Sequence, residues 1–221
     1  MATMQKPAST YRLKIALRGI EPPIWRSVVV LGDTGLSEFH AILQTALGWK
    51  DAHPHNFTIG KNTYGVPVPG ARHLLDEKRF TLQALLTEKE KAFSYTYDPG
   101  DDWRYEILVE AIGTQGPKDQ VPSCLGGARA CPPEDCGGVS GYQALVAALA
   151  DPNHPDHGSM KKKAGDFKAE AFDLKRVNEL LKPFAVAPKL AVAAPAIQGR
   201  NELCACGSKK KFKHCHGAAK K

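Results

Sequence analysis

Apolar and polar residues alternate strictly near the N-terminus of this 221-residue chain. Between residues 11 and 18 every second side chain is apolar, and most of the intervening ones are basic. A period of two is typical of a strand with one buried face. The pair Pro22-Pro23 interrupts the pattern, and the mostly apolar residues 24–30 predict a second, more deeply buried strand.

The next apolar residues recur at helical spacing. Leu36, Phe39, Leu43 and Leu47 lie three or four residues apart, and Gly48 follows them. This spacing predicts an amphipathic helix that ends at Gly48.

Shorter patterns complete the assignment. Strands are predicted at 57–59, 93–97 and 103–111, and helices at 81–87, at 141–150 and, after Asp173 as the capping residue, at 174–181. The turn at 98–102 joins two of these strands into a hairpin, whereas residues 113–139, rich in Gly and Pro, are predicted to form a long irregular loop. The order of strands, helix, strands and helices predicts an α+β domain with a largely antiparallel sheet and packed helices.

Composition and charge divide the chain. Residues 182–198 are rich in Ala, Pro and Val, which indicates a linker between a body at 1–181 and a small module at 199–221. The net charge is +7, of which the last 23 residues supply +6. A nearly neutral body with a basic tail favours a scaffold that carries a charged contact module.

Two absences from the sequence bear on location. It contains no run of 18 apolar residues, and the first ten residues contain no apolar signal region. We therefore expect no membrane span and a cytoplasmic location, with the six cysteines reduced or metal-bound.

Three cysteines and a histidine cluster within 13 residues of the tail, at Cys204, Cys206, Cys215 and His216. Three thiolates and one imidazole suit a closed tetrahedral Zn²⁺ site, and the metal would replace the core that so short a segment lacks. The alternatives are free thiols or a disulfide between the first two cysteines, which would close a very small ring.

The same stretch resembles the SEC-C motif, a small zinc-binding unit. The motif has the pattern Cys-x-Cys-x8-Cys followed by Cys or His, with Gly-Ser and Lys-Lys in between, and the four residues above occupy its ligand positions. Ala205 departs from the usual Pro, and the nearby His214 offers an alternative imidazole ligand.

The body resembles the plasmid pRiA4b ORF-3-like family. The most distinctive matching segment is Gly-Ala-Arg-Ala-Cys-Pro-Pro-Glu-Asp at 127–135. Other matching segments lie at 11–15, 22–26, 39–49, 53–57, 95–103 and 151–157. The resemblance implies an α+β fold of a type carried by mobile elements, and it implies no established activity.

Potentially reactive side chains are spread along the body. They are His40, His53, His55, Asp98, Asp101, Asp102, Cys124, Cys131, Cys136, Glu134, Asp135, His154 and His157. Together they suggest a pocket that holds a metal or performs acid–base chemistry. The alternative is that the carboxylates are ordinary turn residues, the thiols small buried side chains and the last two histidines exposed loop residues. We expect Trp25 and Trp103 to be core residues.

Two functions fit these features. The first is a non-enzymatic binding or adaptor protein whose zinc module contacts an acidic partner, such as nucleic acid, the ribosome or a protein. The contact would be made through Lys209, Lys210, Lys211 and Lys213. The second is a metal-dependent hydrolase acting on nucleic acid, with Asp98, Asp101, Asp102, Glu134 and Asp135 as acids or metal ligands. Convergence of these groups in one cleft favours the enzyme, whereas scattered positions favour the binding protein.

Overall fold

The computed structural model describes residues 8–68, 73–87, 90–116 and 119–185, together with 201, 210 and 211. In these ranges eight strands form one sheet with the order β5-β4-β3-β6-β7-β1-β2-β8. The strands are β1 (Ser9–Leu17), β2 (Trp25–Leu31), β3 (His55–Ile59), β4 (Asn62–Gly65), β5 (Leu74–Asp76), β6 (Ala92–Tyr97), β7 (Trp103–Thr114) and β8 (Ser123–Ala128). Neighbouring strands are antiparallel except β4 and β5, which confirms the predicted α+β class with a largely antiparallel sheet.

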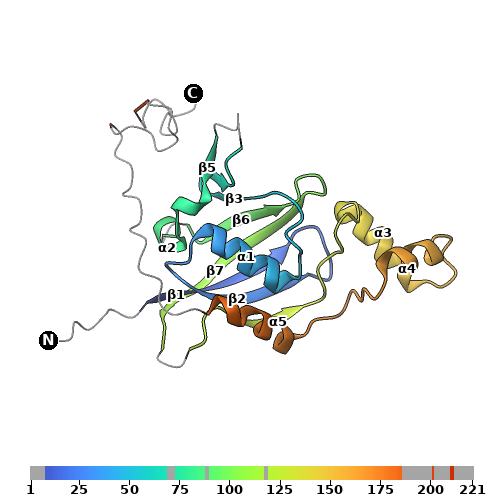
Figure 1. The fold of residues 1–221 in the computed structure, drawn as a ribbon. Helices are drawn as coiled ribbons and strands as arrows, with labels where there is room; N and C mark the ends of the chain where they lie inside the picture. The colour runs from blue at the N-terminus through green and yellow to red at the C-terminus, as the bar shows by residue number, and fades with distance from the viewer. Residues whose placement is uncertain are drawn as a thin grey trace.

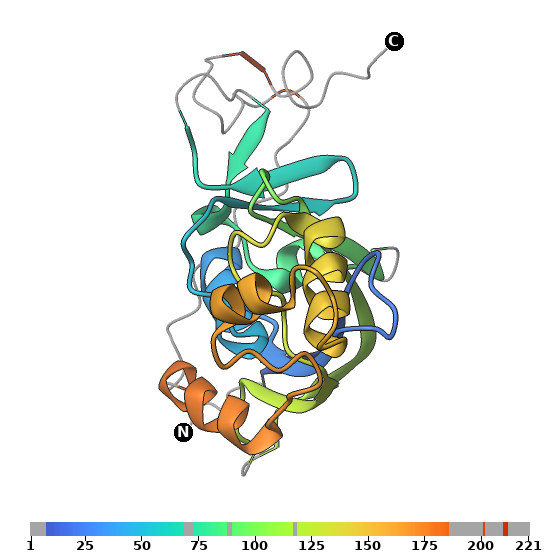
Figure 2. The same ribbon diagram turned by 90° about the vertical axis from the view of Figure 1, so that its right-hand side faces the viewer.

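Helix α1 lies across one face of the sheet (Figure 1). The helices are α1 (Leu36–Leu47), α2 (Leu82–Leu85), α3 (Gly138–Ala150), α4 (His157–Ala164) and α5 (Leu174–Leu181), with 3-10 turns at Glu77–Arg79 and Lys182–Phe184. Helices α3 and α4 pack against each other beside the sheet (Figure 2). Among the described residues no helix is both long and apolar enough to cross a membrane.

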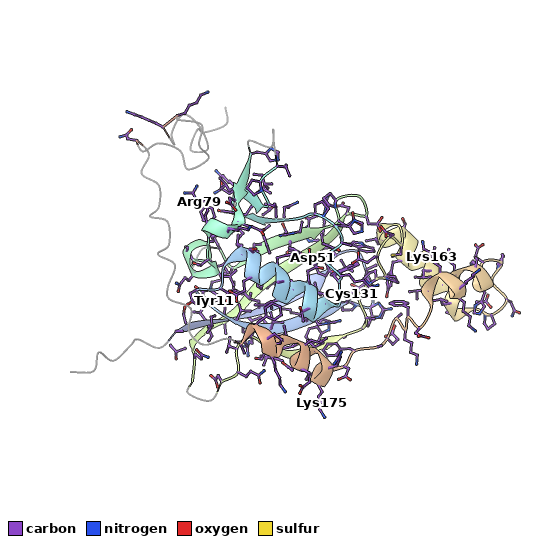
Figure 3. All side chains as sticks on the ribbon, in the orientation of Figure 1. Tyr11, Asp51, Arg79, Cys131, Lys163 and Lys175 are labelled. Atoms are coloured by element: carbon purple, nitrogen blue, oxygen red, sulfur yellow. The ribbon has the colours of Figure 1, made fainter. Side chains whose placement is uncertain are left out.

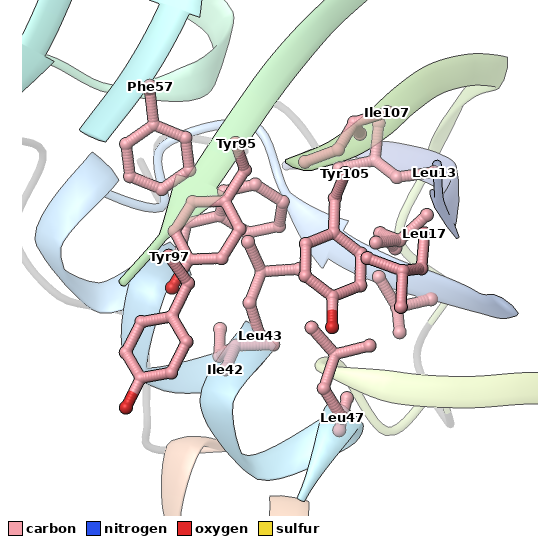
Figure 4. Packing of buried hydrophobic residues seen from close by; sticks show 14 of the residues in the cluster. Leu13, Leu17, Ile42, Leu43, Leu47, Phe57, Tyr95, Tyr97, Tyr105 and Ile107 are labelled. Carbon is pink, nitrogen blue, oxygen red and sulfur yellow. The ribbon is translucent and has the colours of Figure 1, made fainter. Parts of the chain in front are cut away.

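The core lies between α1 and the sheet (Figure 4). Leu13, Tyr95 and Tyr105 point from three strands toward Leu43 on the helix, and all four are fully buried. The opposite face of the sheet carries ion pairs such as Arg12–Glu110 between neighbouring strands, together with the exposed apolar side chain of Leu108. The alternation in the sequence therefore placed the first strand correctly, with its apolar residues toward the helix.

Trp103 is a core residue as predicted, with no exposed surface, but the prediction for Trp25 is wrong. Arg26 pairs with Ile15 in the sheet, and directly paired residues share a face, so the arginine points inward and Trp25 points outward. The ammonium of Lys14 lies 5.4 Å from the half-buried Trp25 ring. The buried guanidinium donates hydrogen bonds to the carbonyl oxygens of Trp25, Ala46, Ala128 and Arg129.

Strand β8 lies inside the segment predicted to be irregular. The strand is hard to predict from the sequence because it contains two glycines, and glycine is unfavourable in strands. A Cβ on Gly127 would lie 2.8 Å from the Arg26 Cδ, from the Phe172 ring and from a backbone oxygen. Only glycine fits this close approach, so tertiary packing and not local preference explains the residue.

Candidate functional site

The predicted zinc ligands Cys204, Cys206, Cys215 and His216 lie outside the described residues, as do Lys209 and Lys213. Lys210 and Lys211 are described and exposed. The zinc site therefore stays a prediction, supported by the chemistry of its donor set, because three thiolates and an imidazole match the ligands of structural zinc.

Four of the reactive side chains in the body lie close together, around the imidazole of His53. His53 lies in the turn after α1, Asp98 follows the last residue of β6, and Glu134 and Asp135 lie in the loop between β8 and α3. The His53 Nε2 atom is 3.2 Å from Asp135 Oδ1, 3.7 Å from Asp98 Oδ2 and 3.8 Å from Glu134 Oε2. We call these four residues the histidine–carboxylate cluster.

Asp98 is held in place by its own turn. Its Oδ1 atom accepts hydrogen bonds from the backbone amides of Gly100 and Asp101, at 3.0 and 3.4 Å, and its backbone amide donates to the Pro54 carbonyl oxygen. Its φ of 49° is in the left-handed region, where Asp is among the few residues found. This conformation leaves Oδ2 directed at His53.

Glu134 is fixed in the same way. Its Oε1 atom accepts hydrogen bonds from the Lys50 backbone amide and the Tyr97 hydroxyl, both at 3.0 Å. Burial, and then the neighbouring Glu134, raise the pKa of Tyr97 to about 12, so the phenol is the proton donor. The other carboxylate oxygen, Oε2, and the His53 Nε2 atom are both buried and have no hydrogen-bond partner among the described residues.

Asp135 forms the exposed side of the cluster. Its side chain is 77% exposed, and its φ of 55° is again left-handed. The Lys163 ammonium donates to its backbone carbonyl oxygen at 3.1 Å, which ties α4 to this loop. The donor atoms of His53, Asp98 and Asp135 lie within 4.8 Å of one another and can hold a divalent cation or share a proton, with the Glu134 carboxylate beside them.

A closed ring of hydrogen bonds holds the turn that carries His53. The Asp51 amide donates to Gln44 Oε1, and Gln44 Nε2 donates to the Tyr95 hydroxyl, each at 2.8 Å. Because that hydroxyl accepts from Gln44, it donates to His40 Nδ1 at 2.9 Å, and His40 Nε2 donates to Asp51 Oδ1 at 2.8 Å. This direction requires neutral His40, and burial, followed by the neighbouring His55, lowers the pKa of His40.

His55 extends the ring on its other side. Its imidazole stacks on that of His40, with ring centroids 3.4 Å apart, and its Nε2 atom lies 2.8 Å from a carboxylate oxygen of the buried Glu77. Asp51 and Cys131 lie near the C-terminal end of α1 (Figure 3). The sequence did carry one signal for this network, because His40 and Gln44 are polar residues four positions apart on the buried face of a helix.

The remaining reactive residues are scattered. The Asp101 carboxylate accepts from the Gly137 amide, and Asp102 pairs with the exposed Arg104. Cys124, Cys131 and Cys136 are buried, and burial raises the pKa of each thiol, that of Cys136 to about 11. His154 and His157 bond to nearby backbone in the α3–α4 region. The structure thus brings together His53, Asp98, Glu134 and Asp135 and leaves Asp101 and Asp102 engaged elsewhere.

Comparisons with known proteins cover the body and the tail separately. A family model described as plasmid pRiA4b ORF-3-like protein matches residues 9–176, and the SEC-C motif matches residues 200–218. The uncharacterised protein y4hQ of Sinorhizobium fredii is 35% identical over 186 residues, which are 80% of this chain and 93% of that protein. A crystal structure of a protein of unknown function, MM3350 from Methanosarcina mazei Go1, has a TM-score of 0.73 and 32% identity, covering 77% of this chain and 98% of the other.

Proposed function

The chain belongs to the plasmid pRiA4b ORF-3-like family, and from that premise we propose that it is a non-enzymatic binding protein with a C-terminal zinc module. In this proposal the body supplies a folded scaffold, and the module contacts an acidic partner, of which nucleic acid is the first candidate. The ribosome surface and an acidic protein are the other candidates.

The SEC-C match at 200–218 carries the proposal. Within it lie all four predicted zinc ligands and, between the second and third ligands, Lys209, Lys210, Lys211 and Lys213. Zinc bound to three thiolates has a net charge of about −1, so the four lysines leave the module positive. A metal-held loop would also lose less conformational entropy on binding than an unstructured tail.

The body suits a scaffold because its own charges are largely balanced. Arg12 of β1 pairs with Glu110 of β7 on the face of the sheet opposite α1, and Arg18, directly after β1, pairs with Glu106 of β7. Paired surface charges of this kind do not form a basic surface for a phosphate backbone. The unbalanced charge of the chain therefore lies in the tail.

Salt dependence of binding tests the proposal. If about four phosphates are contacted, the logarithm of the binding constant for duplex DNA should fall with the logarithm of salt concentration with a slope of about −3 to −4. Changing the four loop lysines to Gln in the full chain should flatten this slope and leave the zinc content unchanged. The matched control changes Lys161, Lys162, Lys168 and Lys175, four exposed lysines of the body, to Gln.

Two results would reject the tail as the contact surface. One is an equal loss of binding in both four-lysine variants, which would indicate a general charge effect. The other is unchanged binding by a chain that ends at Pro195. A slope near zero with retained binding to acidic protein would instead favour a protein partner.

A metal-dependent hydrolase is the second candidate, because Asp98, Glu134 and Asp135 do gather around His53. Against it, Asp101 and Asp102 are bonded elsewhere. Hydrolysis of single-stranded DNA or RNA that requires Mn²⁺ and disappears in Glu134→Gln would favour the enzyme over the binding protein.

A further inference from the structure

We propose that the histidine–carboxylate cluster of the body binds one divalent transition-metal ion of the manganese class. The ligands are His53 Nε2, Asp98 Oδ2, Glu134 Oε2 and Asp135 Oδ1. The site is separate from the thiolate set of the tail, and its occupation does not depend on hydrolytic activity.

The donor atoms of three of the four residues, His53, Asp98 and Asp135, lie within 4.8 Å of one another, which is close enough for them to share one ion. Ligand bonds of about 2.0–2.2 Å place two donors on one metal roughly 2.8–3.6 Å apart, for angles between octahedral and tetrahedral. The three distances from His53 Nε2 are 3.2, 3.7 and 3.8 Å. The two longer distances must shorten on binding, and Glu134, which lies outside the group of three, must bring its Oε2 atom toward the other donors to complete the set.

Unsatisfied atoms point to a missing partner. The nitrogen of His53 and the Oε2 atom of Glu134 are buried without a hydrogen bond from any residue that the structure describes. Buried polar atoms are nearly always satisfied, so two of them facing each other need an explanation. A cation between them supplies it, since each has a lone pair to donate.

The supporting contacts are those of a metal site. Asp98 and Glu134 each use one carboxylate oxygen for protein hydrogen bonds and present the other to the cluster. Hydrogen bonds to the non-ligating atoms of metal ligands orient them and are a regular feature of metal centres. The left-handed backbone at Asp98 and Asp135 is the sort of strain that functional sites retain.

The negative charges of the cluster also favour a bound cation. The Asp98 and Glu134 side chains are only 10% and 15% exposed, so their negative charges are weakly screened. Three carboxylates around one imidazole repel one another unless a positive charge lies between them. A divalent ion compensates two of the three negative charges, which a single imidazolium cannot.

A second group, His40, Asp51 and His55, also brings donor atoms close together. There both nitrogens of His40 already have hydrogen-bond partners, and the ring through Gln44 and Tyr95 is closed. A metal would have to break that ring. We therefore assign the ion to the cluster and a positioning role to the ring, which fixes the turn that carries His53.

The donor set selects the ion. One imidazole with three carboxylates and no thiolate favours an oxygen-preferring transition metal, of which Mn²⁺ is the representative, over the soft-ligand zinc site expected in the tail. The outward Asp135 leaves room for water in the remaining positions, because its side chain is mostly exposed.

The test titrates the metal-free full chain with Mn²⁺ and measures binding from the decrease in the electron paramagnetic resonance signal of free Mn²⁺. We expect one bound ion per chain, and at least about tenfold weaker binding in Glu134→Gln and in His53→Gln. The matched control is Asp102→Asn, a carboxylate of the same hairpin that pairs with Arg104 outside the cluster, and it should bind as the unaltered chain does. The full chain with Cys204→Ser and Cys206→Ser should also retain its Mn²⁺ affinity, because thiolates are poor ligands for this ion.

Thermal unfolding distinguishes a metal-binding role of Glu134 from a role as an ion-pair partner of His53. If the cluster binds a cation, Glu134→Gln relieves repulsion, so the metal-free variant should melt at the same or a higher temperature while losing the stabilisation that Mn²⁺ gives the unaltered chain. If Glu134 serves only as a partner of protonated His53, the metal-free variant should melt lower and Mn²⁺ should stabilise neither protein. Equal Mn²⁺ affinity in all variants, no Mn²⁺ binding by the unaltered chain, or loss of binding in the cysteine variant would overturn the proposal.

Discussion

Removing the Tyr95 hydroxyl tests the hydrogen-bond ring beneath the cluster. Tyr95 is fully buried, and its hydroxyl both accepts from Gln44 Nε2 and donates to His40 Nδ1. Tyr95→Phe deletes that one oxygen and leaves the apolar ring in place. Two buried polar atoms on α1 then lose their partner at once.

The expected loss of stability follows from these two contacts. A typical hydrogen bond contributes about 1 kcal/mol net, and a buried group left without its partner costs about 1–3 kcal/mol. Two bonds of 2.8 and 2.9 Å in a fully buried setting therefore predict a loss of about 2–4 kcal/mol. The matched control is Tyr64→Phe, since Tyr64 is also buried but, among the residues that the structure describes, its hydroxyl accepts only a 3.5 Å contact from Asn62. We expect the control to lose less than about 1 kcal/mol.

Urea unfolding at pH 8, monitored by tryptophan fluorescence, measures both variants. With an unfolding slope of about 2 kcal/mol per molar urea, the midpoint of Tyr95→Phe should fall by about 1–2 M at an unchanged slope. A shift no larger than that of Tyr64→Phe would refute the closed ring, because it would mean that Gln44 and His40 find other partners.

Two further predictions concern acid stability and the tryptophans. The pKa of His40 in the folded protein is lowered below its ordinary 6.5, so as pH falls the unfolded chain takes up the proton first. The contribution of neutral, buried His40 to the free energy of unfolding is therefore complete above about pH 6.5 and is lost as pH falls toward the folded pKa. Urea midpoints from pH 8 to 5.5 should show this loss, and a His40→Gln variant with an equally steep loss would contradict it. Trp103→Ala should lower the free energy of unfolding by about 3–5 kcal/mol, and Trp25→Ala, at a half-buried position, by about 1–2 kcal/mol. Calorimetry or urea unfolding measures both losses, and equal losses would contradict the different environments of the two side chains.

The sequence alone determined the features that depend on neighbouring residues. The period-two pattern at 11–18 and the helical spacing at 36–47 placed β1 and α1 correctly, because side-chain periodicity is local and one face of each element must be buried. Asp173 was recognised as the residue before a helix, and its carboxylate accepts from the Arg176 amide at the start of α5. The donor set of the tail was also readable, since its four residues lie within 13 positions.

The tertiary structure decided the features that depend on residues far apart in the chain. The sequence prediction placed Trp25 in the core, on the wrong face of β2, because the register of β2 against β1 determines which residues of the strand face inward. It also missed β8, in which Gly127 is required by close packing against Arg26 and Phe172.

The histidine–carboxylate cluster is the clearest case. His53 and Asp135 are more than 80 positions apart. Both were among many potentially reactive residues in the sequence, and no sequence pattern distinguished them from the others. Their meeting depends on where β6 ends, on the turn held by the His40 ring and on the loop before α3. Because these contacts are made only when distant segments pack together, no local pattern in the sequence records them.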